Sequence, residues 1–339
     1  SLTARPTETH TTTPGTTDTN VQQQTAQPHL QELARASGPP LRSVQFVPGD
    51  DPDAVAASLG QRADAVILDL EEPRTPFSEA QRDGARRVVS EFLQGLGDDG
   101  GRPLYFVRVQ DLDSGQILRD LDAATHRQLA GIAVPKIDGP GDVRAVDAML
   151  RCFEADRGLE LGSTWIYPIL ETAHALRNSY EIAMASPRVA YMGGAVSRFG
   201  DIVREIGYRW TAEGAESLYL RSKVLIDARA AGIRYPVSGM WAGPQSDLDG
   251  LRRWAEHLRD LGYHGMLLGP PSHIDIVNEV FSPSAEDLER WRSLVATVDA
   301  AGDSEDRVYF GDPDDEWHVV HQAHVSSARQ GLEWAEALR

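Results

Sequence analysis

The sequence predicts a (β/α)₈ TIM barrel. It contains eight short apolar runs of the kind that form strands buried on both faces of a parallel sheet. A segment with helical periodicity follows each run. The runs begin about 31 residues apart on average, close to the βα repeat of a barrel of roughly 250 residues. Strands and helices that alternate in this number favour right-handed crossovers into one closed sheet.

The expected strands occupy residues 43–47, 65–70, 104–109, 131–135, 165–170, 189–192, 235–240 and 265–268, which assigns the barrel to residues 41–300. The fifth run ends at Leu170 and is followed directly by Glu171. The sixth run ends in Gly193-Gly194, and Asp201 lies in the next loop. We expect the functional site to be built around this strand–helix–strand unit, which places an acid after each strand.

The segments outside the barrel differ from it in composition. Residues 1–40 are rich in Thr, Gln and Pro and almost lack apolar side chains, which predicts a disordered tail. Residues 303–316 hold seven acids and one base, and an amphipathic helix follows them to the end of the chain. Residues 301–339 are therefore assigned to an acidic linker and a helical extension of the barrel.

Composition limits the classes of partner. The net charge of -18 argues against nucleic acids and anionic membranes as partners. No apolar run approaches the roughly 20 residues that a membrane helix needs. The single cysteine, Cys152, excludes an internal disulfide and fits a reducing compartment, so we expect a cytoplasmic protein.

Charged residues stand at the ends of most of the expected strands: Asp69, Glu71, Arg108, Lys136, Glu171 and Asp201. In a parallel α/β barrel, residues just past the carboxyl ends of the strands line the active site. Burying charge in a strand is costly, so charge at so many strand ends indicates a polar mouth.

Glu171 and Asp201 are candidate ligands of Mg²⁺ or Mn²⁺, because carboxylates suit these hard cations. The alternative is structural: Asp201 caps the helix at 202–206 and Glu171 pairs with an arginine. Arg108 is a candidate for neutralising a carboxylate or an enolate oxygen through its fixed donors. An ion pair with Glu71 or Glu72 is compatible with that role.

Two further features of the mouth are open to more than one interpretation. Lys136 is a candidate Schiff-base nucleophile, but nearby acids would keep its amine protonated. A structural or phosphate-contacting role is favoured. Gly193 and Gly194 allow a close approach of the backbone, here to a substrate or CoA, although no phosphate-loop motif is present.

The sequence resembles the citrate lyase β-subunit family of CoA-ester lyases, within the HpcH/HpaI aldolase superfamily. The resemblance runs from about Leu41 to Ser284. The motifs that carry it are Arg42-Ser43-Val44-Gln45-Phe46-Val47-Pro48-Gly49, Ala65-Val66-Ile67-Leu68-Asp69-Leu70-Glu71-Glu72, Val107-Arg108-Val109-Gln110, Val134-Pro135-Lys136, Leu170-Glu171-Thr172, Gly200-Asp201, Asp247-Leu248-Asp249-Gly250-Leu251, Pro271-Ser272-His273-Ile274 and Val277-Asn278-Glu279-Val280-Phe281-Ser282-Pro283-Ser284.

The resemblance implies a Mg²⁺-dependent barrel that acts on CoA thioesters. It places the metal ligands at Glu171 and Asp201 and the enolate-binding arginine at Arg108. Asp69 and Glu71 match the acids that support this site. The resemblance also places Arg42 near the phosphates of CoA. It further implies a homotrimer or homohexamer in which a C-terminal segment covers the neighbouring subunit's site.

The sequence departs from the family's pattern at several positions. Gln110 stands where the family commonly has Asn, and Glu72 where it has Asp. Gly269-Pro270-Pro271 replaces the usual Ile-His-Pro, so the histidine is missing. His321 aligns with the usual aspartate of the lid, where it is a candidate for proton transfer because histidine titrates near neutrality.

We therefore expect a Mg²⁺-dependent carbon–carbon lyase that cleaves or forms a β-hydroxyacyl-CoA, with an acyl-CoA and a 2-oxo acid as the other side of the reaction. Two alternatives are an aldolase that acts on free 2-oxo acids without CoA and a non-catalytic barrel with a binding or regulatory role. Arg42 and Lys136 favour the lyase over the free-acid aldolase.

Overall fold

The computed structural model describes residues 38–97, 103–194, 196–301, 309–310 and 318–339. Residues 1–37 of the expected tail and most of the expected acidic linker lie outside these ranges. Within them, no helix is both long and apolar enough to cross a membrane.

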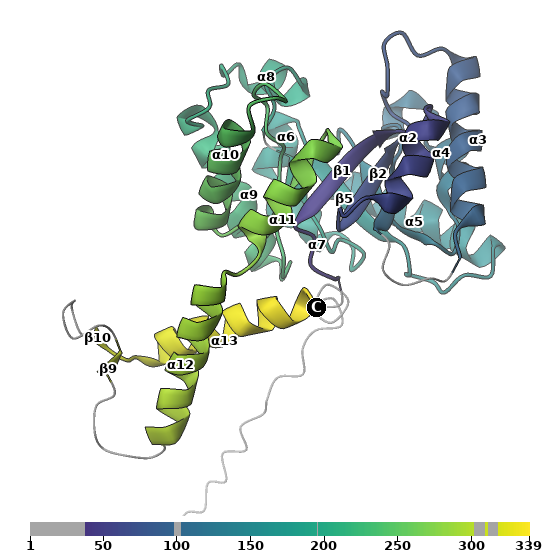
Figure 1. The fold of residues 1–339 in the computed structure, drawn as a ribbon. Coiled ribbons are helices and arrows are strands. Elements are labelled where there is room, and N and C mark those ends of the chain that lie inside the picture. The colour runs from purple at the N-terminus through teal and green to yellow at the C-terminus, as the bar shows by residue number, and fades with distance from the viewer. Residues whose placement is uncertain (1–37, 98–102, 195, 302–308, 311–317) are drawn as a thin grey trace, which may run out of the picture.

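Eight parallel strands form a nearly closed barrel, as the sequence predicts (Figure 1). In chain order they are β1 (Ser43–Pro48), β2 (Ala65–Asp69), β3 (Leu104–Arg108), β4 (Leu129–Val134), β5 (Trp165–Leu170), β6 (Gly193–Gly194), β7 (Val237–Ser238) and β8 (Gly265–Leu268). They are hydrogen-bonded in the order β6-β5-β4-β3-β2-β1-β8-β7. The sheet nearly closes between β6 and β7, where a Cβ on Gly239 would lie 2.9 Å from the carbonyl oxygen of Gly194.

Helices surround the strands (Figure 1). The longer ones are α3 (Glu79–Gly95), α5 (Pro140–Asp156), α9 (Leu218–Ala230) and α10 (Leu248–Leu261), and the shorter ones are α2 (Pro52–Ala57), α4 (Ile117–Ala124), α6 (Ala173–Arg177), α7 (Ser179–Met184), α8 (Asp201–Ile206) and α11 (Ile274–Phe281). Side chains cap their starts: Ser78 and Gln81 form a capping box at α3, and Asp247 accepts from the backbone N–H of Gly250 at α10.

Residues of each strand face the barrel interior and the helix layer in turn. In β2, Ala65 and Ile67 pack inside with Phe106, whereas Val66 and Leu68 pack against the helices. This period of two continues to the strand ends. It turns the last residues of β2 and β3, and the residue after β5, toward the barrel axis, where Asp69, Arg108 and Glu171 form part of the mouth.

The strand starts form the closed floor of the barrel. The hydroxyl of Tyr191 donates to the carbonyl of Pro39 over 2.7 Å, and Leu41 is fully buried beneath the strands. Residues 38–40 therefore pack against the floor. Three residues of the expected tail are thus in contact with the barrel.

Strands β6 and β7 are shorter than the sequence predicts, and β6 begins four residues late. The apolar run 189–192 is buried but forms no strand, and it follows a turn at 187–188. The N–H of Ala190 donates to the carbonyl of Arg188 beside that turn. Pairing with β5 starts only at Gly193 and Gly194. Hydrophobicity alone marks burial here, whereas the glycines determine where the backbones can meet.

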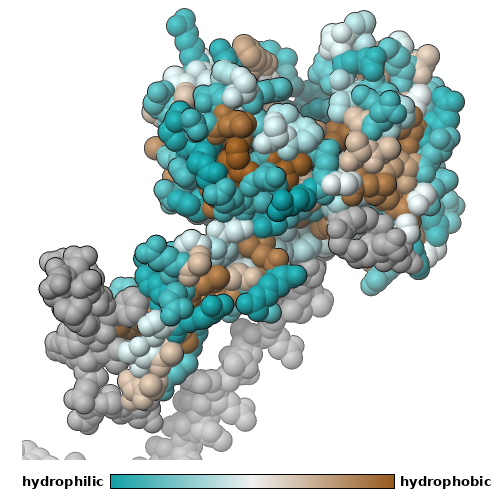
Figure 2. Space-filling model, in the orientation of Figure 1, coloured by the Kyte–Doolittle hydropathy of each residue, from teal (hydrophilic) through white to brown (hydrophobic). Residues whose placement is uncertain are grey.

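The C-terminal extension is a pair of helices, α12 (Ala285–Ala301) and α13 (Gln322–Ala337), with a two-stranded ribbon of β9 (Tyr309–Phe310) and β10 (His318–Val319) between them. Trp334 of α13 donates through Nε1 to the carbonyl of Phe281 over 3.0 Å and packs on the ring of His264. His264 precedes β8, so the pair docks at the floor. Figures 1 and 2 show that it projects from the barrel.

Candidate active site

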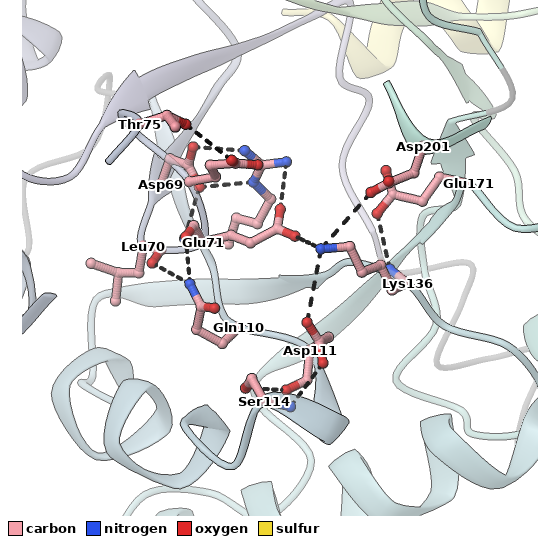
Figure 3. Close-up of polar contacts among 12 residues, drawn as sticks. Asp69, Leu70, Glu71, Thr75, Gln110, Asp111, Ser114, Lys136, Glu171 and Asp201 are labelled. Carbon is pink, nitrogen blue, oxygen red and sulfur yellow. Dashed lines mark hydrogen bonds and ion pairs between the residues drawn. The ribbon is translucent and has the colours of Figure 1, made fainter. Parts of the chain in front are cut away.

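The charged residues at the carboxyl ends of the strands meet at one mouth, as predicted (Figure 3). Asp69 and Arg108 are the last residues of β2 and β3 and are paired in register. Lys136 follows β4 by two residues, Glu171 follows β5, and Asp201 is the first residue of α8. The parallel sheet brings them together because all its strands end on the same side.

Arg108 is fixed by two carboxylates and an aromatic ring. Its Nε and one terminal nitrogen donate to the two oxygens of Asp69 over 2.8 and 2.7 Å. The other terminal nitrogen lies 2.9 Å from Glu71 Oε2, and the guanidinium lies over the ring of Phe46. Burial alone would lower the pKa of Arg108, but Asp69 and Glu71 outweigh burial and raise it. The group is therefore a permanent, oriented cation.

Glu71 connects Arg108 to Lys136. Its Oε1 accepts from Lys136 Nζ over 2.8 Å, and the same ammonium lies 3.8 Å from an oxygen of Asp111 and 3.8 Å from an oxygen of Asp201. Burial lowers the pKa of Lys136, but these acids raise it overall. A Schiff-base nucleophile needs the opposite shift, so the structure disfavours that alternative.

Gln110 holds the loop that carries Glu71. Its side-chain nitrogen donates to the carbonyl of Leu70 over 2.8 Å and also to the carbonyl of Glu71. Its own backbone N–H donates to Asp120, which is held by Arg86. The glutamine that departs from the family's pattern is thus a buried anchor of the acidic loop.

Glu171 feels the charge of Arg108, but no arginine of the described residues is close enough to form an ion pair with it. In the described part of the chain it forms no ion pair, and Oε1 accepts one hydrogen bond, from the backbone N–H of Lys136 over 3.0 Å. Burial and the nearby charges of Glu71 and Asp201 raise the pKa of Glu171 to about 7. This carboxylate lies in a position where a further cation would be strongly favoured.

Asp201 lies beside Glu171 in the mouth (Figure 3). The residue that caps α8 is Gly200, and the carboxylate of Asp201 faces Lys136 and the exposed Arg204. Among the described residues, no group of three or more His, Cys, Asp or Glu side chains is arranged to hold a metal ion. Two carboxylates nevertheless fit Mg²⁺, which usually keeps several waters and takes one or two protein carboxylates. The donor set is therefore suitable for this ion.

Gly193 and Gly194 have a packing role in the structure. Gly194 has a φ of 108°, and a Cβ there would lie 2.6 Å from the carbonyl oxygen of Leu170. A Cβ on Gly193 would lie 2.6 Å from the hydroxyl of Tyr167. The pair lets β6 approach β5 directly beside Glu171, which accounts for both glycines without a bound ligand.

Arg42 is not brought to the mouth. It precedes β1, and its guanidinium bonds both oxygens of Asp64 and the hydroxyl of Ser282 at the floor. The expected contact between Arg42 and CoA therefore does not fit a ligand that binds at the mouth. This placement follows from strand direction, because a residue before a strand lies at the opposite barrel end from a residue after it.

His321 lies just before α13 on the projecting helix pair and is exposed. Its backbone N–H donates to Nδ1 of His324 over 3.0 Å. Because the pair docks at the floor, His321 does not reach the mouth of its own chain.

Sequence reasoning missed two residues of the site. Asp111 approaches Lys136, and Phe46 supports Arg108. Asp111 had a detectable signal, since it is an acid three residues past the end of β3. The position of Phe46 in β1 followed from the alternation of that strand, but the cation above its ring did not.

Comparison with known proteins identifies the family. The model of the HpcH/HpaI aldolase/citrate lyase family matches residues 42–271, which is more than half of the chain. The chain belongs to this family. The match confirms the resemblance inferred from the motifs, and it confirms that the protein is an enzyme of the carbon–carbon lyase type.

Two relatives cover most of the chain. A (3S)-malyl-CoA thioesterase from Cereibacter sphaeroides is 30% identical over 299 residues, which is 88% of this chain and 96% of the relative. The citrate lyase β subunit of Escherichia coli is 31% identical over 265 residues, which is 77% of this chain and 83% of that subunit.

Solved structures share the architecture. A citrate lyase β subunit from Mycobacterium tuberculosis, complexed with oxaloacetate and magnesium, is 25% identical with a TM-score of 0.55 and covers 74% of this chain and 99% of its own. The protein CitE from the same organism, complexed with magnesium, acetoacetate and coenzyme A, has a TM-score of 0.63 at 24% identity, with 89% of this chain and 99% of that chain covered.

Proposed function

We propose that the protein is a Mg²⁺-dependent carbon–carbon lyase that cleaves a β-hydroxyacyl-CoA to an acyl-CoA and a 2-oxo acid, or catalyses the reverse condensation. The observation that carries the proposal is the arrangement of the mouth. An oriented arginine, Arg108, shares it with a carboxylate pair, Glu171 and Asp201, that suits a hard cation. Magnesium and a 2-oxo acid in a related citrate lyase β subunit support it.

Glu171 and Asp201 would hold the metal, with water and substrate oxygens completing its shell, and Mn²⁺ would suit the same donors. When bound, the ion supplies Lewis-acid activation and a template for the carbonyl and carboxylate oxygens of the 2-oxo acid.

Arg108 would bind the thioester oxygen that becomes negative during the reaction. In the cleavage direction, the β-hydroxyl loses its proton and becomes the new oxo group, and the C–C bonding electrons pass to the thioester as an enolate. A proton then returns to the enolate carbon. Two of the five N–H groups of Arg108 donate to Asp69, and the other terminal nitrogen forms an ion pair with Glu71. The N–H groups that do not bond these acids would serve the enolate oxygen, where charge develops.

The CoA moiety needs a cationic surface near the mouth, since Arg42 lies at the floor. Arginine pairs readily with phosphate oxygens. A hollow of about 440 Å³ lies beside the ends of β1 and β2 and is lined by Arg74 and Arg87, but also by Asp50 and Glu91. Asp50 is ion-paired with Arg74, so the hollow has no net positive charge.

The proposed function is tested by incubating the protein with Mg²⁺ and a panel of β-hydroxyacyl-CoAs, malyl- and citramalyl-CoA included. We expect release of glyoxylate or pyruvate together with an acyl-CoA, and loss of this activity with a chelator or in Glu171→Gln. Conversion of free 2-oxo acids and aldehydes, with no reaction of any thioester, would instead support an aldolase.

Thioester hydrolysis is a second candidate, because a relative with 30% identity over 88% of the chain is a (3S)-malyl-CoA thioesterase. The same mouth could direct water to the thioester carbonyl. The assay separates the two reactions: hydrolysis releases free CoA and a hydroxy acid, whereas the lyase releases a 2-oxo acid and no free CoA.

A further inference from the structure

Lys136 contacts acids from four separate segments of the mouth (Figure 3). Its backbone N–H donates to Glu171, which follows β5, over 3.0 Å. Its Nζ lies 2.8 Å from Glu71 after β2, 3.8 Å from Asp111 after β3, and 3.8 Å from Asp201 in α8. One residue thus joins both candidate metal ligands to the loop that orients Arg108.

The backbone of Lys136 is held in an unfavourable conformation. Its φ is 50°, and among the described residues no other non-glycine residue has a positive φ. Such a conformation is uncommon for a side chain like lysine and persists where the surroundings hold it. Here the same contacts that hold the backbone also direct the ammonium across the mouth.

The mouth holds more acidic than basic side chains. Five carboxylates meet there, those of Asp69, Glu71, Asp111, Glu171 and Asp201. Arg108 is engaged by Asp69 and Glu71, and Arg204 reaches Asp201 only from the exposed rim. Lys136 is therefore the cation that lies among the remaining acids. Its longer separations from Asp111 and Asp201 leave room for adjustment when a second cation enters.

We propose that Lys136 is a positioning residue that acts as the resident counter-cation of the acidic mouth. Its ammonium holds Glu71, Asp111 and Asp201 together before Mg²⁺ binds, and it then weakens Mg²⁺ binding by repelling the ion. The second part rests on the proposed function, which puts Mg²⁺ at Glu171 and Asp201. This role replaces the expected contact of Lys136 with a CoA phosphate, because three carboxylates already surround Nζ.

The role has a consequence for the order of binding. An ion held by two carboxylates beside an ammonium group binds weakly alone. Substrate oxygens that complete its shell bring the missing negative charge and increase its affinity. Lys136 thereby makes tight metal binding depend on the acidic substrate.

The first test compares Lys136→Met with the metal-free wild type. The variant should melt at a lower temperature, since the acids lose their counter-charge. Calorimetry should show about tenfold tighter Mg²⁺ binding, the scale expected when one nearby charge is removed from a partly solvated site. Lys136→Arg keeps the charge and should retain the wild-type affinity.

The chain offers a matched control. Lys223 is the only other lysine in the sequence, and it pairs with Asp227 within α9. Lys223→Met should leave Mg²⁺ affinity unchanged. With only two lysines, ¹³C reductive methylation also gives few NMR signals, and Lys223→Met assigns them. Adding Mg²⁺ should shift the Lys136 signal and leave the Lys223 signal in place.

Three outcomes would overturn the inference in different ways. Unchanged melting temperature and Mg²⁺ affinity in Lys136→Met would remove the counter-cation role altogether. A raised KM for the CoA ester, with unchanged Mg²⁺ affinity, would show a phosphate contact instead. If the wild type binds no Mg²⁺, the proposed metal site fails, and with it the repulsion. A lower melting temperature of metal-free Lys136→Met would then still support the positioning role by itself.

Discussion

Arg108 combines a fixed orientation with spare donors. Its contacts to Asp69 and Glu71 use one edge and one end of the guanidinium, and Phe46 supports its face. Orientation that is set before the substrate arrives is what makes a hydrogen-bond donor effective at a developing charge. Asp69, Glu71 and Phe46 therefore contribute to the function of Arg108 by fixing its orientation.

Replacing Arg108 with Lys tests this geometry. The variant keeps a positive charge but cannot bond both oxygens of Asp69 and still present donors to the substrate. We expect kcat/KM to fall at least ~100-fold, the scale of losing one oxyanion donor. The melting temperature of the purified variant serves as the folding control. Near-normal turnover would exclude Arg108 from the chemistry.

The raised pKa of Glu171 predicts how the stability of the metal-free protein changes with pH. Its folded pKa of about 7 lies above the ordinary value of 4.5, through burial and the charges of Glu71 and Asp201. A raised carboxyl pKa means that the stability from this group is fully present below 4.5 and is lost as the pH rises through 7. Between these values the metal-free wild type should therefore lose stability relative to Glu171→Gln.

The measurement is a set of chemical denaturation curves for both proteins from pH 4.5 to 8 in the presence of a chelator. Saturating Mg²⁺ should restore wild-type stability at pH 8, since binding favours the ionised carboxylate. In Glu171→Gln, Mg²⁺ should increase the stability only slightly. A stability difference that does not change with pH would contradict the raised pKa.

At the level of elements, the C-terminal helix pair depends on a small aromatic contact with the barrel floor. The ring of Trp334 lies 4.6 Å from that of His264 and 5.0 Å from that of Tyr235, measured between centroids. Arg234 adds an exposed ion pair with Glu333, which contributes little by comparison. A hollow of about 930 Å³ lies next to this contact.

Low pH should weaken the contact between the helix pair and the barrel floor. Burial and the charge of Arg229 lower the pKa of His264 to about 4. A lowered pKa means that the stability from this histidine is present above its ordinary value of 6.5 and is lost as the pH falls through 4. Hydrogen exchange of α13 should accordingly speed up between pH 6.5 and 4, after correction for the intrinsic pH dependence of exchange.

His264→Phe keeps the aromatic contact but cannot titrate, so its corrected α13 exchange should not depend on pH. Trp334→Ala should release the pair at every pH, at a cost of about 3 kcal/mol for a buried tryptophan. Equal protection of α13 in the wild type at pH 4 and 7 would refute the role of His264.

At the scale of the whole molecule, the barrel and most of the residues at its mouth can be predicted from the sequence alone. Apolar runs predict the strands, and charged residues after them predict a polar rim, since parallel strands all end on one side. The contacts of Lys136 depend on a backbone angle and on three loops, which no local pattern encodes. The boundaries of β6 depend on how closely two backbones approach, which hydrophobicity does not report.

Arg42 and His321 show a different limit. Strand direction alone places Arg42 at the floor, because it precedes β1. The resemblance to the family instead implies a contact between Arg42 and the phosphates of CoA. The position of His321 depends on a surface outside its own barrel, because the helix pair leaves from the floor and projects away. A residue that acts in a neighbouring subunit cannot be placed from one chain, whether from its sequence or from its fold.

The projecting pair therefore suggests a shared site. We propose that the protein forms a homo-oligomer, a trimer or a hexamer, in which His321 of each chain reaches the mouth of the next and transfers the proton. Histidine suits this task because its unperturbed pKa is about 6.5. Glu171→Ala and His321→Ala should each be inactive, but mixing them after dissociation and reassembly should restore activity, because some mouths then hold an intact carboxylate pair beneath an intact lid. Mixing Glu171→Ala with Asp201→Ala is the matched control and should restore nothing, since both changes affect the same chain's mouth. Full activity of His321→Ala alone, or no recovery despite mass-spectrometric proof of subunit exchange, would rule out the shared lid.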